Sequence, residues 1–213
     1  MFRLIFREFN PEIHDVYKVA ELIYDVDFRT FKHVFKSKEE GVEAIKNRLV
    51  LIDFSKEAEE DENDLFYVFF DDEDVEEKEI IGMFNGGKGV QHSLLGDIKK
   101  QFKTLNFREA LGLSKVSFMD NFVLVDVEDD DFYICELAIC SSKRGKGYGS
   151  EALDQLIQLA RDLDCKRVVL DADFRNDGAY RLYCSRGFKV FNKKSFGIPG
   201  KKRGMRNMEL VLK

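Results

Sequence analysis

The stretch Arg144-Gly145-Lys146-Gly147-Tyr148-Gly149 follows a β-like run, Phe132 to Cys140, and leads directly into an amphipathic helical run. Its three glycines allow backbone N–H groups to turn toward one point without a Cβ in the way, and the start of a helix adds partial positive charge there. Lys143, Arg144 and Lys146 add full positive charges around the same point. This arrangement predicts a binding site for a ligand that carries phosphate.

A glycine-rich turn between a strand and a helix occurs in nucleotide, dinucleotide and coenzyme A sites alike. A P-loop requires four residues between its first glycine and a Gly-Lys-Ser/Thr sequence, which residues 145–150 do not offer. A dinucleotide-binding fold places the motif after its first strand and continues with repeated strand–helix units. Here the motif comes late, after several runs typical of antiparallel strands, so the order of elements disfavours both of these sites.

A second motif extends from Asn176 to Phe188 and reads Asn-Asp-Gly-Ala-Tyr-Arg-Leu-Tyr-Cys-Ser-Arg-Gly-Phe, just after a short Val/Leu-rich run at 167–171. Together with Arg144-x-x-Gly147-x-Gly149, it resembles the GNAT superfamily of acyl-CoA-dependent N-acyltransferases. The family's pattern of Asn, Ala three residues later, Leu-Tyr and then Gly-Phe is matched at every named position. The resemblance is strong from Asp131 to Phe188 and rests on the order of strands alone outside that range.

The resemblance implies an α/β fold with a mixed, largely antiparallel central sheet of six or seven strands and with helices on both faces. We expect a single N-acetyltransferase domain over residues 1–213, with a helical insertion at about 92–117. The sheet should splay near Glu136 to Ile139, at the cofactor site. The residue pattern predicts strands at 2–9, 65–70, 79–84, 118–127, 131–140, 167–171, 188–196 and 205–212, and helices at 11–24, 31–49, 147–163 and 177–185.

The co-substrate that the resemblance implies is acetyl-CoA. Coenzyme A carries a pyrophosphate and a further phosphate, which suit a loop of free N–H groups and basic side chains. Its pantetheine arm can pair like an added strand with an open sheet edge, which in this family is the strand before the loop, often splayed by a bulge. Asn176 would anchor the arm from the other side, or would only cap the helix that follows it. The residues expected to bind the cofactor are Leu137, Ala138, Ile139, Lys143, Arg144, Gly145, Lys146, Gly147, Tyr148, Gly149, Ser150, Asn176, Ala179 and Tyr183.

Tyr183 is the candidate general acid of the reaction that the resemblance implies. An amine attacks the thioester directly, and the leaving thiolate is helped by a proton donor close to the sulfur. A tyrosine with an ordinary pKa of about 10 stays protonated at neutral pH and can still donate its proton to a thiolate. An amphipathic core tyrosine is the alternative interpretation.

Glu136 is the candidate general base, because an incoming ammonium group must lose a proton before it can attack. It stands among apolar residues in the strand before the loop, where an ionisable group is costly to bury without a partner. A surface-facing strand position is the alternative. Asp120, Asp171 and Asp173 are weaker candidates, and a water molecule held by a carboxylate is a further option.

The composition restricts the class of protein. A chain of 213 residues, of which 44% are hydrophobic, can bury a sizeable core. The first eight residues carry charges too early for a signal peptide, and no later run could span a bilayer, so we expect a cytoplasmic protein without a membrane partner. The four cysteines lie in apolar runs and indicate buried reduced thiols, while His14, His33 and His92 lack the spacing of metal ligands, so no metal is expected.

The net charge is −6, and acidic residues concentrate in residues 57–64, 71–79 and 126–131. This excess argues against nucleic-acid binding. Solvated loops are the ordinary interpretation of such runs. Alternatively, one of them attracts a cationic amine substrate.

The expected function is transfer of an acetyl group from acetyl-CoA to a primary amine, with a small molecule as the preferred acceptor. Two alternatives stay open: a protein N-terminal or lysine acetyltransferase, and a non-catalytic acyl-CoA-binding regulatory module. A lid formed by residues 92–117 would favour a small molecule, whereas an open peptide groove would favour a protein acceptor. A homodimer is a further possibility.

Overall fold

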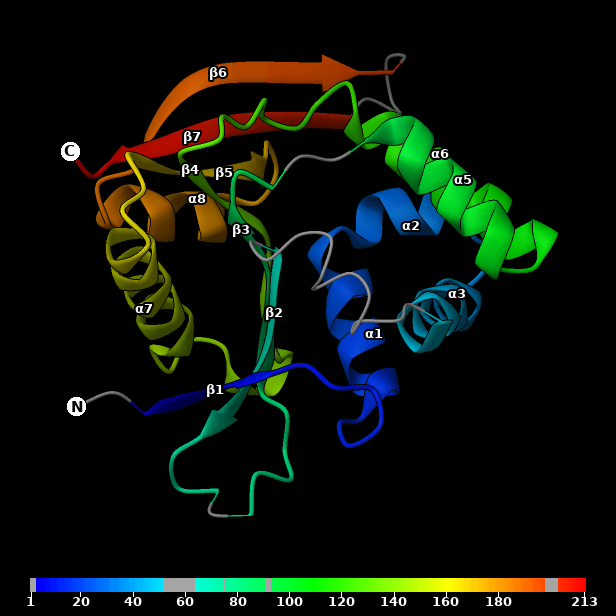
Figure 1. The fold of residues 1–213 in the computed structure, drawn as a ribbon, viewed down its shortest axis with the longest axis horizontal. Coiled ribbons are helices and arrows are strands. Elements are labelled where there is room, and N and C mark those ends of the chain that lie inside the picture. The colour runs from blue at the N-terminus through cyan, green and yellow to red at the C-terminus, as the bar shows by residue number, and fades with distance from the viewer. Residues whose placement is uncertain (1–2, 52–63, 75, 91–92, 198–202) are drawn as a thin grey trace.

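The strands of the protein form one seven-stranded sheet in the order β1-β2-β3-β4-β5-β7-β6 (Figure 1). This computed structural model describes residues 3–51, 64–74, 76–90, 93–197 and 203–213. Strands β4 and β5 are parallel, and all other neighbouring strands are antiparallel. The strands are β1 (Leu4–Glu8), β2 (Asp64–Asp71), β3 (Gly82–Lys88), β4 (Asp131–Ile139), β5 (Arg167–Asp173), β6 (Lys189–Phe196) and β7 (Arg203–Val211). The mixed, largely antiparallel sheet expected from the sequence is confirmed.

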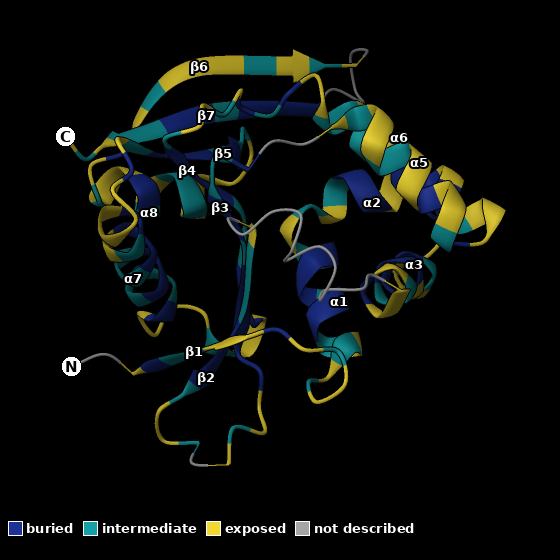
Figure 2. Ribbon diagram, in the orientation of Figure 1, coloured by how far each residue is buried: buried dark blue, intermediate teal, exposed yellow. Residues whose placement is uncertain are grey.

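Helices cover both faces of the sheet (Figure 1). One face carries α7 (Tyr148–Asp162) and α8 (Asp177–Ser185), and the other carries the helices of the N-terminal half. Each face has its own buried hydrophobic cluster, and Figure 2 shows burial following the sheet and the inner sides of α1 and α7. The N-terminal helices are α1 (Val16–Val26), α2 (Phe28–Val34), α3 (Lys38–Leu51), α5 (Leu94–Thr104) and α6 (Phe107–Asp120).

Helix α7 illustrates why these segments adopt their structure. Its apolar residues recur every three or four positions, so they form one stripe that packs against the sheet. Leu153 and Leu156 on this stripe are fully buried, and burial of each leucine contributes roughly 2 kcal/mol. The stripe fixes the position of the helix start, and therefore of the glycine-rich loop that precedes it.

Helices α5 and α6 occupy the segment for which a helical insertion was expected. Ser114 Oγ donates to Gln101 Oε1 at 2.7 Å, and Gln101 Nε2 donates to Ser117 Oγ at 3.1 Å, so a buried glutamine joins the two helices. The helical character of the segment is thus present, while its origin as an insertion stays a prediction. Residues 1–2, most of the acidic run at 57–64, and residues 91–92 lie outside the described residues.

Three predicted elements differ from the structure. No strand forms at 118–127: α6 continues to Asp120, and Val125 packs against Tyr133 and Val169 without joining the sheet. The alternating valines therefore marked a buried face and not a paired strand. The helix expected at 31–49 is two helices, α2 and α3, with extended backbone at Phe35 between them. The strand expected at 79–84 starts at Gly82 and continues to Lys88.

Strand β4 diverges from β5 halfway along its length. The two strands pair from Asp131 to Ile134 on β4, and the ladder between them does not continue along residues 136–139. The register between β3 and β4 shifts at the same point, because Asn85 lies opposite Glu136 while Gly86 lies opposite Ile134. Cys135 is therefore the extra residue of a β-bulge. The splay expected near Glu136 to Ile139 is present.

Candidate active site

The glycine-rich loop turns sharply between β4 and α7. Gly145 and Gly147 have φ values of 75° and 96°, a region that favours glycine, and Gly147 occupies the N-cap position of α7. The first N–H groups of a helix have no acceptor within the helix, and within the described part of the chain the N–H groups of 145–149 donate no hydrogen bond. Five backbone donors at a helix start are therefore available to an anionic group.

The basic side chains around the loop have different partners. Lys143 lies 2.9 Å from Glu79, and this hydrogen bond raises the pKa of the lysine. Arg144 Nε donates to the carbonyl of Ile139 at 2.9 Å, which ties the loop to the end of β4. Lys146 is exposed. The loop therefore keeps the positive charges of Arg144 and Lys146, whereas the ion pair with Glu79 partly neutralises the charge of Lys143.

Arg3, just before β1, contacts the glycine-rich loop, and this contact was not predicted from the sequence. Its Nη2 donates to the carbonyl of Lys146 at 2.7 Å, and its guanidinium lies 4.7 Å from the centre of the Tyr148 ring. Glu151 holds the same strand by accepting from the N–H groups of Arg3 and Leu4. No local signal could have identified Arg3, because more than 140 residues separate it from the loop.

A cavity of about 1530 Å³ opens between the splayed strands and reaches the helices of the N-terminal half. The predicted site residues that line it are Glu136, Leu137, Ala138, Ile139, Arg144, Gly145, Gly147, Gly149, Ser150, Asn176, Ala179 and Tyr183. Lys143, Lys146 and Tyr148 do not line it. The Tyr148 side chain is buried instead, and its hydroxyl donates to Asp71. The structure therefore brings most of the predicted site into one cavity.

Tyr183 lies on α8 with only 8% of its surface exposed, and its ring packs against Phe188. Burial raises its pKa to about 12, and the negative charge of Asp171 acts in the same direction. Among the described residues, the Tyr183 hydroxyl has no hydrogen-bond partner. Tyr183 is thus protonated at neutral pH, and its proton is available to a ligand in the cavity.

Glu136 follows the bulge on β4 and is half-buried. Burial raises its pKa to about 7, and the charges of Asp120 and Asp27 add to this effect, while Arg48 and a hydrogen bond from Asn85 oppose it. A carboxylate that titrates near neutral pH can accept a proton and release it again. The geometry and charge of Glu136 therefore suit proton transfer.

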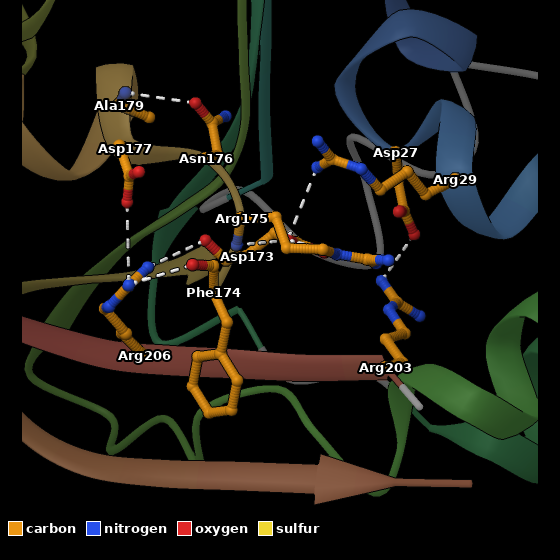
Figure 3. Close-up of polar contacts among 10 residues, drawn as sticks. All are labelled: Asp27, Arg29, Asp173, Phe174, Arg175, Asn176, Asp177, Ala179, Arg203 and Arg206. Carbon is orange, nitrogen blue, oxygen red and sulfur yellow. Dashed lines mark hydrogen bonds and ion pairs between the residues drawn. The ribbon is translucent and has the colours of Figure 1, made fainter. Parts of the chain in front are cut away.

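Asn176 caps helix α8, because its Oδ1 accepts from the N–H of Ala179 at 3.1 Å (Figure 3). This is the capping role that the sequence left open. The Asn176 side chain still lies at the cavity, where its NH₂ group can contact a ligand.

Half-buried carboxylates lie around one buried arginine, Arg203, at the far end of the cavity. Arg203 at the start of β7 lies 2.6 Å from Asp27, between α1 and α2, and pairs with Asp120 at the end of α6 (Figure 3 shows the first contact). Burial raises the pKa of Asp120 to about 6, although Arg203 opposes the shift. Asp171 on β5 is half-buried, and desolvation raises its pKa as well. These carboxylates outnumber their cation, so this end of the cavity attracts positive charge.

The three weaker base candidates all lie at the cavity, and each has partners of its own. Asp120 pairs with Arg203, and Asp171 accepts from Tyr133 Oη at 2.8 Å and from Asn207. Asp173 lies 3.4 Å from Arg29 and 3.2 Å from Arg175 (Figure 3). The sequence did not identify Asp27, nor the pairing of Arg203 with carboxylates, because only the fold brings the α1–α2 junction beside the start of β7.

Two kinds of site find no support among the described residues. No group of three or more His, Cys, Asp or Glu side chains there could hold a metal ion. None of the described helices combines the length and the apolar character needed to cross a bilayer.

Comparison with solved structures shows the same fold in several acetyltransferases. A putative acetyltransferase from Salmonella typhimurium, solved with its cofactor acetyl-CoA, is 15% identical with a TM-score of 0.58, over 99% of this chain and 95% of that one. A spermidine N-acetyltransferase from Vibrio cholerae, solved with CoA and spermine, is 14% identical with a TM-score of 0.58, over 98% and 95%. An N-acetyltransferase from Staphylococcus aureus Mu50 is 15% identical with a TM-score of 0.57, over 99% of both chains.

No curated protein sequence matches the chain significantly. A family model does match: that of the acetyltransferase (GNAT) family aligns with residues 23–188, which is well over half of the sequence. The match contains both the glycine-rich loop and the motif that begins at Asn176. The splayed strands and the free N–H groups of the loop also fit coenzyme A. The chain therefore belongs to the GNAT family and is an acetyl-CoA-dependent acetyltransferase.

Proposed function

We propose that the protein transfers the acetyl group of acetyl-CoA to a primary amine of a small molecule, by direct attack of the amine on the thioester. The observation that supports this most is the continuity of the cavity. It is lined at one end by the glycine-rich loop and the splayed part of β4, and at the other by the carboxylates around Arg203. Donor and acceptor can therefore bind side by side in a single space.

The cofactor would bind along the loop and β4. The N–H groups of residues 145–149 would hold the pyrophosphate, with Arg144, Lys146 and Ser150 around it. The backbone of Leu137, Ala138 and Ile139 has no partner on the β5 side, so it can pair with the amides of the pantetheine arm. Asn176 and Ala179, at the start of α8, would contact the arm from the opposite wall.

Glu136 and Tyr183 divide the proton transfers between them. Glu136 accepts a proton from the ammonium group of the acceptor, directly or through water, which frees the nitrogen lone pair. The nitrogen then forms a bond to the acetyl carbon, and the bond from that carbon to sulfur breaks. Tyr183 donates its proton to the departing thiolate, and the acylated nitrogen gives up its second proton to the resulting phenolate, directly or through water. Near neutral pH Tyr183 keeps the proton that it must donate, and Glu136, with a pKa of about 7, is ionised in part of the molecules and increasingly so as the pH rises.

Two features support a small cationic acceptor. Helices α5 and α6 contribute to the cavity wall through residues such as Leu94, Lys100 and Val116, so they bound the space for the acceptor on one side. The carboxylates around Arg203 favour a cation there. The Vibrio cholerae protein of similar fold is a spermidine N-acetyltransferase solved with CoA and spermine, and this likeness supports the choice of a cationic amine.

An acceptor panel tests the proposal. Purified protein and acetyl-CoA are incubated with aliphatic monoamines, diamines, amino acids, and peptides that carry a free N-terminus or lysine. Release of the CoA thiol and mass spectrometry of the product are measured together. Turnover of at least one small amine is expected. Turnover of peptides alone would establish a protein acetyltransferase instead, and acetyl-CoA binding by calorimetry without any turnover would establish a regulatory module.

A further inference from the structure

Asn85 on β3 lies directly opposite Glu136 on β4. Residues paired in this way on antiparallel strands project to the same face of a sheet, with Cβ atoms about 4.5–5.5 Å apart. Both side chains are half-buried and both line the cavity. An asparagine amide and a glutamate carboxylate are thus neighbours at the floor of the acceptor site.

The β-bulge creates this pairing. Before the bulge, Gly86 lies opposite Ile134, and the regular register would continue with Asn85 opposite Cys135. Because Cys135 is skipped, Glu136 moves to the face that Asn85 occupies. Without the bulge, Asn85 would lie opposite Cys135, and the side chains of Asn85 and Glu136 would project to opposite faces of the sheet.

Gly86 allows the strands to come this close. Its φ is 148°, and a Cβ at this position would lie 2.0 Å from the carbonyl oxygen of Tyr133. No other residue could occupy the position without displacing β3 from β4. Two adjacent residues of β3 therefore have separate roles: Gly86 leaves room for the bulge, and Asn85 presents its side chain to Glu136.

Several charged groups act on Glu136 from the elements packed against it. Arg48 of α3 favours its ionised form, while Asp120 at the end of α6 and Asp27 between α1 and α2 oppose it. Arg48 is exposed, so solvent and salt weaken its effect. Asn85 acts from β3, and its hydrogen bond lowers the pKa of Glu136 against the larger effect of burial. It is a neutral donor that stays next to the carboxylate when the acceptor arrives.

We propose that Asn85 is a positioning residue for acetyl transfer, whose side-chain amide orients the Glu136 carboxylate toward the acceptor and favours its ionised form. The inference rests on the proposed role of Glu136 as the base. Asn85 itself need not contact either substrate. Its contribution should therefore appear in the pH dependence of catalysis and not in the affinity for acetyl-CoA.

The experiment compares pH profiles of kcat for wild type, Asn85→Ala and Asn85→Gln with one amine at saturation. Loss of the amide donor in Asn85→Ala should move the acid limb of the profile to higher pH by about one unit. Most of the rate should return at high pH, because Glu136 is then ionised without help. Asn85→Gln retains an amide and should move the limb less than Asn85→Ala does. The KM for acetyl-CoA should be unchanged in both variants.

Two controls separate the possible failures. Asn192→Ala alters an exposed asparagine on the outer strand β6 and should leave the profile in place. Glu136→Gln should remove the acid limb; if the limb persists in this variant, the proposed base is wrong. If Glu136→Gln removes the limb but Asn85→Ala leaves it at its wild-type pH, the inference about Asn85 is overturned while the role of Glu136 stands. A loss of rate at every pH in Asn85→Ala with the acid limb unmoved would also overturn it, because a purely structural defect lowers the rate without changing the pKa of the base.

Discussion

Tyr183 and Glu136 approach the cavity from opposite faces of the sheet. Tyr183 belongs to α8 and to the hydrophobic cluster under α7, whereas the charges that act on Glu136 come from α3, α6 and the α1–α2 junction. Burial raises both pKa values, but with different consequences. The tyrosine stays protonated at neutral pH and can donate its proton, and the glutamate becomes a base that titrates near neutral pH. One physical effect thus produces the acid and the base.

At the scale of single residues, Tyr183→Phe is the most specific test of the proposed general acid, because it removes the hydroxyl alone. The hydroxyl has no hydrogen-bond partner among the described residues, so its removal should hardly change the thermal midpoint of unfolding. The kcat should fall by about 100-fold, because a general acid contributes at least that much. The affinity for acetyl-CoA, measured by calorimetry, should stay within twofold of wild type. Equal turnover of variant and wild type across the whole pH range would exclude Tyr183 as the acid.

The elements that matter most are the loop between β4 and α7 and the splayed half of β4. The loop was predictable because its signal is local: three glycines, basic residues, and a helical stripe follow one another in the sequence. Helix α8 and its Asn176 cap were predictable for the same reason. The segment 118–127 was predicted wrongly, since alternation of apolar residues reports a buried face and not whether neighbouring strands leave room for another. Asn85, Arg203 and Arg3 were out of reach because their partners are distant in sequence.

The glycine at the helix N-cap gives a prediction for the loop. In Gly147→Ala, an L residue must adopt a φ of 96°, which costs about 1–2 kcal/mol or forces the loop to change shape. The first N–H groups of α7 would then no longer converge. We expect the dissociation constant for CoA to rise by about tenfold or more while turnover at saturating acetyl-CoA falls less.

Gly96→Ala provides the matched control for the loop, since Gly96 lies in α5 with an ordinary helical backbone and does not line the cavity. Its affinity for CoA should equal that of wild type. Wild-type affinity in Gly147→Ala would mean that the loop does not bind the phosphates through its backbone.

At the scale of the whole molecule, the carboxylates that line the cavity destabilise the folded state. Asp27, Asp120 and Asp171 act on the buried Arg203, Glu136 lies close enough to be affected by Asp27 and Asp120, and burial raises the pKa of each carboxyl group. A packed apolar floor would avoid this repulsion. A cationic acceptor would reduce this repulsion between the carboxylates when it binds.

Stability should therefore depend on pH in a defined direction. The pKa of Glu136 is about 7 in the folded protein against an ordinary value of 4.5, so the folded state holds a proton that the unfolded chain releases between these values. The free energy of unfolding should fall as the pH rises from about 5 to 7. Urea unfolding of the substrate-free protein should show this slope, and Glu136→Gln should reduce it. An identical slope in the variant would show that Glu136 does not titrate in this range.

The most direct measurement is a crystal structure of the protein with CoA and an amine that the acceptor panel identifies. The pyrophosphate is expected on the N–H groups of residues 145–149, with the pantetheine arm along Leu137 to Ile139. The sulfur should lie within hydrogen-bond reach of the Tyr183 hydroxyl, about 3 Å or one water molecule away, and the amine should lie beside Glu136. A sulfur remote from Tyr183, or an amine bound outside the cavity, would contradict the assignment of this cavity as the site of acetyl transfer.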